Sequence, residues 1–152
     1  MAGVKIATVF DSIAALVVSG VTIKDVDEIP EAVLVRHCPV MFPDPDSPVS
    51  GLRVDPQTTG AGTNGKNNVL YTLNYVYLHT PVGEGRFIAG NISGMVAKCV
   101  LILNALIAND AVTGSIDIEP RIEGEFGVMS DATGAQFWGF RIAIDVLEFY
   151  EV

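Results

Sequence analysis

The sequence predicts an α+β domain in which a mainly antiparallel sheet is covered on one face by two helices. Two segments place apolar residues at helical spacing, and three longer segments alternate apolar with polar residues. No internal repeat or linker divides the 152 residues. A chain of this length can bury one proper hydrophobic core, so residues 1–152 are expected to form a single domain.

The first third is expected to contain one helix and two short strands. The helix has one apolar face and should end at Gly20; the residues of that face are Ile6, Val9, Phe10, Ile13 and Val17. Residues 21–23 and 32–35 are rich in β-branched side chains and flank an acidic turn, which favours strands.

Residues 43–66 are predicted to form a long irregular loop or arm. Five of the eight prolines lie between Pro39 and Pro56, and four glycines follow from position 51 to position 65. Proline removes backbone donors and glycine adds conformational freedom. Long loops in compact domains are often functional. The start of this arm is therefore a candidate contact with a neighbouring subunit, through Pro43, Asp44, Pro45 and Asp46.

The remaining elements alternate strand and helix signals. Residues 69–78 form the clearest strand, and one of its faces carries Tyr71, Leu73, Tyr75 and Tyr77. Residues 87–108 are predicted to be a helix whose apolar face is Ile88, Ile92, Met95, Cys99, Leu103 and Leu106. A half-exposed strand is expected at 115–122 and a glycine-rich turn region at 124–134. The last strand should span 136–150, with Phe140, Ile142, Ile144 and Val146 facing one way.

Composition limits the partners of the chain. Eighteen acidic and nine scattered basic residues give a net charge of −9, which argues against a surface built to grip nucleic acid but suits a conduit that must not hold DNA. Charged residues make up 18% of the chain, and the mean hydropathy is +0.41. Such a chain must hide apolar surface. Residues 87–109 are the best membrane candidate, but Lys98 and several polar residues favour burial against protein, and no membrane partner is expected.

The motifs that suggest chemistry lack the context that chemistry needs. Gly60 to Lys66 has the G-x-G-x-x-G spacing and nearly matches a phosphate loop, but Asn67 replaces the hydroxyl residue and a strand signal follows instead of a helix. The two cysteines and two histidines are too few and too dispersed for a zinc site, so reduced thiols in an intracellular protein are expected. The acidic groups are interpreted as solvated faces, with the lining of a ring as the alternative. No catalytic residue, metal or cofactor is predicted.

The closing strand has large apolar side chains on both faces. Phe137, Trp138 and Phe140 lie in one short stretch with few charges. A strand that is apolar on both faces is either a central core strand or part of a subunit interface, and the sequence supports the two interpretations equally. These three residues are therefore further candidates for self-assembly contacts.

The order of these features resembles that of the tail terminator, or tail completion, proteins of long-tailed bacteriophages. The matching segments are the first helix leading to Gly20–Ile23, the Pro-rich Pro39–Pro48, the strand Leu70–Leu78, the helix Ile88–Ala108 and the closing strand Trp138-Gly139-Phe140-Arg-Ile-Ala-Ile-Asp-Val-Leu-Glu148. The resemblance covers nearly the whole chain and is one of pattern and order, without a diagnostic motif.

The resemblance implies a homohexameric ring that closes the head-proximal end of the tail tube and docks onto the head-completion protein of the neck. DNA would pass through its channel without specific binding. Such a protein is a non-enzymatic virion component assembled in the host cytoplasm, and residues 43–66 would supply subunit or docking contacts. The alternatives are another neck or minor tail component or, in different classes, a small nucleotide-binding enzyme that uses Gly60–Lys66 and a monomeric binding module.

Overall fold

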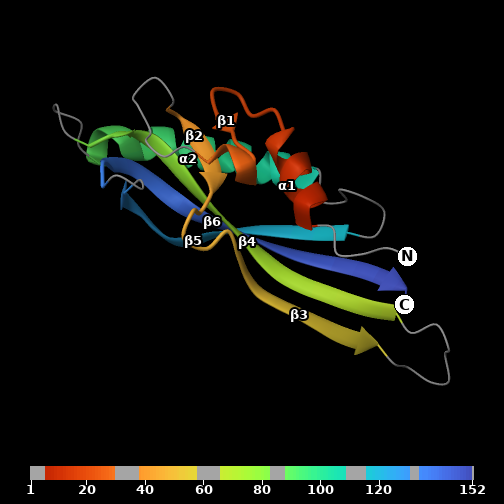
Figure 1. Ribbon diagram of the computed structural model, residues 1–152. Coiled ribbons are helices and arrows are strands. Elements are labelled where there is room, and N and C mark those ends of the chain that lie inside the picture. Colours follow the sequence, from red (N-terminus) through yellow and green to blue (C-terminus); the bar gives the residue numbers. More distant parts are fainter. Residues whose placement is uncertain are drawn as a thin grey trace.

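The computed structural model describes residues 6–29, 38–57, 66–82, 88–108, 116–130 and 134–151. These residues form an α+β structure with a mixed, mostly antiparallel sheet of six strands and two α-helices (Figure 1). The elements are α1 (Ile6–Ala14), β1 (Thr22–Ile23), a 3-10 turn (Val26–Glu28), β2 (Val40–Pro43), β3 (Val49–Gln57), β4 (Lys66–Pro81), α2 (Ile88–Ala108), β5 (Ile116–Ser130) and β6 (Gln136–Glu151). The strand expected at 32–35 lies outside the described residues.

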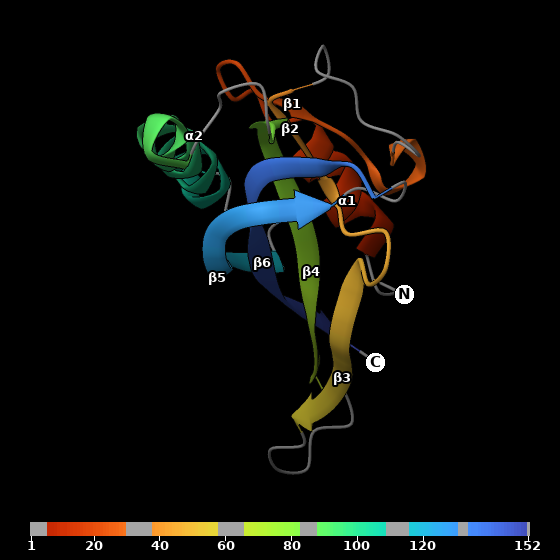
Figure 2. The ribbon, with the colours of Figure 1, turned by 90° about the vertical axis from the view of Figure 1, so that its left-hand side faces the viewer.

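The sheet is built around the antiparallel pair of its two longest strands. Strands β4 and β6 pair from Lys66 opposite Glu151 to Pro81 opposite Phe137. Strand β5 pairs with the other edge of β6, while β2 and β3 share the free edge of β4, one after the other. The short β1 pairs with β2 in parallel. Figure 2 shows that the sheet twists and that β3 extends beyond the part of the sheet beside the helices.

The prediction of an irregular segment over residues 43–66 is wrong for its central part. Residues 49–57 form β3, which is hydrogen-bonded to β4. Because β3 pairs with β4 on one side alone among the described residues, it is an edge strand, where Pro56 is tolerated. Gly51 has a φ of 64° at a register shift between Ser50 and Arg53, so the glycine forms a β-bulge without breaking the strand. Residues 58–65 lie outside the described part of the chain.

Two element boundaries also differ from the predictions. The turn region expected at 124–134 belongs largely to β5, which continues to Ser130 because an irregularity between Glu123 and Gly127 absorbs the glycines. Helix α1 ends at Ala14, although its apolar spacing continues to Val17. Val17 is 93% exposed, so it contributes nothing to the buried face.

The main core lies between the sheet and residues from both helices. One buried cluster contains all eight residues that the alternation predicted for one face of each long strand, which confirms the alternation in both strands. They are Tyr71, Leu73, Tyr75 and Tyr77 of β4 and Phe140, Ile142, Ile144 and Val146 of β6. Helix α1 adds Val9, Phe10 and Ile13 to this cluster, and α2 adds Met95, Cys99, Ile102 and Leu106. Ile92 was expected on the buried face of α2 but is 36% exposed, while Ile102 takes a core position.

A smaller apolar cluster covers part of the other sheet face. Its buried members are Val40, Phe42, Val76, Leu78 and Phe137. These residues come from β2, β4 and β6, so the upper part of the sheet, where β2 pairs with β4, is apolar on both faces. In the lower part of the sheet, where β3 pairs with β4, the second face carries polar side chains.

Candidate functional site

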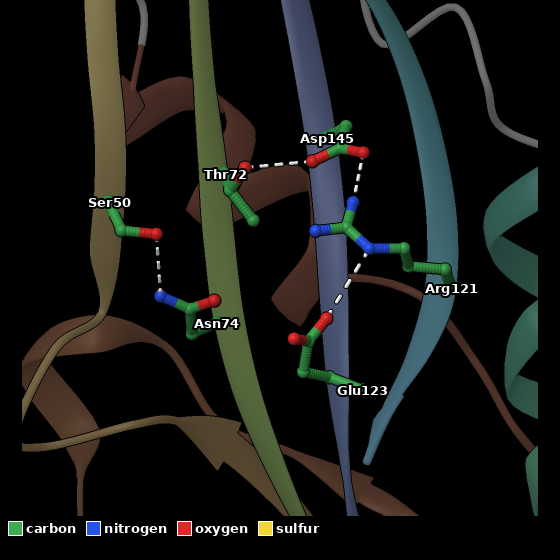
Figure 3. Close-up of polar contacts among 6 residues, drawn as sticks. All are labelled: Ser50, Thr72, Asn74, Arg121, Glu123 and Asp145. Carbon is green, nitrogen blue, oxygen red and sulfur yellow. Dashed lines mark hydrogen bonds and ion pairs between the residues drawn. The ribbon is translucent and has the colours of Figure 1, made fainter.

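Polar side chains gather on the sheet face opposite the main core. Thr72 of β4 lies directly opposite Asp145 of β6, and its Oγ1 donates a hydrogen bond to Asp145 Oδ1 at 2.7 Å. Arg121 of β5 forms an ion pair with the second oxygen of Asp145, and its Nε lies 3.4 Å from Glu123 Oε2. Figure 3 shows the guanidinium of Arg121 between the two carboxylates. These contacts join three neighbouring strands.

A second set of contacts fixes the chain between β2 and β3. The side-chain amide of Asn74 donates to Ser50 Oγ at 3.1 Å (Figure 3). It also donates to Ser47 O at 2.9 Å. The backbone amide of Asn74 donates to Pro48 O at 2.9 Å. Asp44, which is 6% exposed, forms an ion pair with Arg141 of β6. The polar residues before β3 are thus tied to the middle of the sheet.

The polar contacts border a shallow hollow of about 980 Å³. It lies over the lower sheet between β3 and β5, with Leu70 and Leu147 beside Arg53, Thr72 and Asp145 among its lining residues. In the part of the chain that the structure describes, no group of three or more His, Cys, Asp or Glu residues is placed to hold a metal ion.

The carboxylate of Asp145 is held in its charged form. Partial burial raises the pKa of Asp145, but hydrogen bonds from Arg121 and Thr72 and the charge of Arg121 outweigh burial, so the pKa is lower than usual. A carboxylate with a lowered pKa is a weak proton acceptor near neutral pH. This arrangement is therefore suited to holding strands together and to polar contact rather than to proton transfer.

Replacing Asp145 by asparagine is expected to destabilise the fold by about 1 kcal/mol or less at pH 7, because the side chains of Arg121 and Asp145 are 48% and 46% exposed and solvent screens such pairs. The contribution of Asp145 is present above the usual carboxyl pKa and is lost as the pH falls through its lowered value. Urea unfolding at pH 7 and at pH 2 measures both effects. A stability difference between variant and wild type that is larger at pH 2 would contradict this role.

The core face carries one buried and one partly buried polar pair. Tyr71 Oη donates to Glu148 Oε2 at 2.5 Å, and Glu148 is 3% exposed. Near the other end of β4, Tyr77 Oη and His79 Nδ1 are 2.7 Å apart. Burial, aided by the charge of Lys98, lowers the pKa of His79. Lys98 itself donates to Ser19 O at 2.8 Å, which ties α2 to the turn after α1.

The predicted self-assembly residues occupy two kinds of place. Phe137 and Phe140 are 2% and 0% exposed and belong to the two apolar clusters, while Trp138 is half-buried against the main core. The chain's own core therefore accounts for the apolar character of the closing strand at Phe137 and Phe140. In the other group, Pro43 and Asp44 are buried, but Pro45 and Asp46 are exposed. This second pair remains available for contact.

The glycine-rich motif lies outside the described residues up to Gly65. Lys66 is the first residue of β4, paired with Gln57 and Glu151. The strand expected after the motif is confirmed, so no helix follows whose N-terminal amides would hold phosphate.

Sequence reasoning did not find the polar network. Asp145 lies within the closing strand, whose apolar alternation dominates its pattern, and Thr72 and Asn74 lie on the face of β4 opposite Tyr71 and Leu73. The signal was present, because alternation in two antiparallel strands places Thr72, Asn74 and Asp145 on the same sheet face. The register that sets Thr72 opposite Asp145 was needed to recognise the pair.

Helix α2 is the one described helix that is long and apolar enough to cross a membrane. Its window from Asn91 to Ala108 has a mean hydropathy of 1.7, and 22% of the window is buried. A core helix of this composition would be mostly buried. Much of the apolar surface of α2 therefore faces away from the protein.

Together, the fold and these contacts define an α+β sheet protein with a polar network on one face and an uncovered apolar helix surface on the other side of the core. No protein-family model matches the chain, and no curated protein matches it.

Proposed function

We propose that the protein is a structural virion component that assembles into a ring at the head-proximal end of a phage tail tube. The ring would be a homohexamer that caps the tail-tube protein, docks onto the head-completion protein and lets DNA pass without specific binding. It would be assembled in the host cytoplasm and retained in the neck of the virion.

The observation that carries this proposal is the exposed apolar surface of α2. Five large apolar residues of this helix are 36–59% exposed: Ile92, Val96, Val100, Leu101 and Ile107. Exposed apolar surfaces of this size mark contact sites between proteins. In addition, α2 has no acidic residue, although the whole chain carries a net charge of −9. Assembly would cover this surface.

In this proposal the helices cover one sheet face and leave the other to the polar network. The exposed Pro45 and Asp46, in the connection between β2 and β3, would act as a docking element. The net negative charge supports a channel that does not retain DNA, because phosphates are repelled rather than neutralised.

Electron microscopy tests the terminator role directly. The purified protein is mixed with tail tubes from the virus that encodes it, and negatively stained particles are imaged. The expected result is one ring at a single end of each tube. Rings that never associate with tube ends would overturn the terminator role.

A further inference from the structure

We propose that the subunits associate head to tail, with the exposed face of α2 in one copy packed against the β3 edge strand of the next. This inference rests on the proposed function, because it names the surfaces that would build the ring. The face of α2 is defined by its five exposed large apolar residues, and the β3 edge by Leu52 and Val54.

A closed ring needs two different surfaces on each subunit that fit one another. The described residues supply two exposed apolar groups in separate places. Leu52 and Val54 are 56% and 50% exposed on an edge strand, and the α2 face is exposed over several turns. Figures 1 and 2 place α2 beside the upper sheet and β3 beyond its lower end. The two surfaces therefore do not cover each other within one chain.

The two secondary-structure elements that carry these surfaces are similar in length. Helix α2 has 21 residues and is about 31 Å long at about 1.5 Å per residue. Strand β3 has 9 residues and is about 30 Å long at about 3.3 Å per residue. An edge strand also presents unpaired backbone groups, which native proteins cover with a helix or a loop. The α2 face of a second copy can provide this cover.

Charge favours a second copy over a lipid surface. Two copies of this chain, each with a net charge of −9, repel each other least where they meet through surfaces without acidic residues. Helix α2 contains no acidic residue. The one cation of α2, Lys98, is bound to Ser19 O. Helices that lie on membranes carry Lys and Arg on a polar face, whereas the opposite face of α2 is the core of the protein.

Two double variants and their mixture test the head-to-tail contact. V96E with V100E places charge on the α2 face, and L52E with V54E places charge on the β3 edge. All four positions are 43–56% exposed, so the fold should remain intact. The matched control is V128E, because Val128 of β5 is 47% exposed but belongs to neither surface. Light scattering gives the mass, and circular dichroism checks the fold.

We expect each double variant to be monomeric and the control to assemble like the wild type. An equimolar mixture of the two double variants should give a species of two chains, because one intact α2 face meets one intact β3 edge. A β3 variant that still assembles, or a mixture that stays monomeric, overturns the head-to-tail contact.

The wild-type chain separates this inference from the proposed function. Rings that persist in both double variants overturn the contact and leave the ring. If the wild type forms open filaments while the mixture of the two double variants forms a two-chain species, the contact is supported and the closed ring is overturned. A wild type that stays monomeric at every concentration overturns the contact, and sedimentation of that monomer with phosphatidylcholine vesicles would assign α2 to a membrane.

Discussion

Replacing Gly139 by alanine is expected to destabilise the protein by about 3 kcal/mol, at the upper end for an overpacked core. A Cβ at this position would lie 2.0 Å from the backbone oxygen of Tyr77 and 3.3 Å from Met129 Cγ. No rotamer change can move a backbone oxygen, so the β4–β6 pair would have to separate. Urea unfolding followed by the fluorescence of the single Trp138 measures the loss.

Gly127 provides the matched control for Gly139. It lies directly opposite Gly139 on β5, and a Cβ there would meet nothing within 4 Å. Gly127→Ala should therefore change stability by no more than about 0.5 kcal/mol. Equal losses in the two variants would contradict the close approach at Gly139. The protein concentration is kept fixed, because self-association adds to the apparent stability.

The second large effect is expected at alkaline pH. Tyr71, Tyr75 and Tyr77 are at most 2% exposed, and burial raises the pKa of all three hydroxyls. Their stabilising contribution is complete below the unfolded pKa of about 10 and is lost as the pH rises above it, because the unfolded chain releases these protons first. Three protons correspond to about 4 kcal/mol of unfolding free energy per pH unit. Urea unfolding between pH 8 and pH 12 measures this slope.

Single tyrosine variants separate the contributions to this slope. Among the described residues, Tyr75 Oη has no hydrogen-bond partner, so Tyr75→Phe should reduce the slope by about a third and raise stability at pH 7 by about 1 kcal/mol. Tyr71→Phe should reduce the slope equally but lower stability at pH 7 by about 2 kcal/mol, because Glu148 loses a donor. An unchanged slope in both variants would show that these hydroxyls are ionised in the folded protein.

The sequence was sufficient to predict elements with clear periodicity. Alternation placed Tyr71 and Phe140 on the core face of their strands, and helical spacing identified α2. It failed where proline and glycine suggested irregular chain. Pro56 is tolerated because β3 is an edge strand, and Gly51 and Gly127 lie at bulges instead of turns. The order of the strands in the sheet decides where proline and glycine are tolerated, and local composition does not reveal that order.

The polar network and the exposed surfaces depended on strand register and packing. Asp145 becomes informative once Thr72 is known to lie opposite it. The aromatic residues Phe137 and Phe140 were proposed as contacts because the closing strand is apolar on both faces. The small cluster formed with β2 accounts for that second face. The uncovered apolar surface is instead on α2, where the sequence predicted a single buried face.

The mass of the wild-type protein in solution tests most directly whether this chain assembles into the proposed ring. Sedimentation velocity over a range of concentrations is compared with the mass of one chain, 16.2 kDa. A homohexameric ring predicts one discrete species with six times the mass of the single chain and a ring-shaped outline in negative stain. A single-chain species at every concentration, without growth in the presence of tail-tube protein, would contradict it.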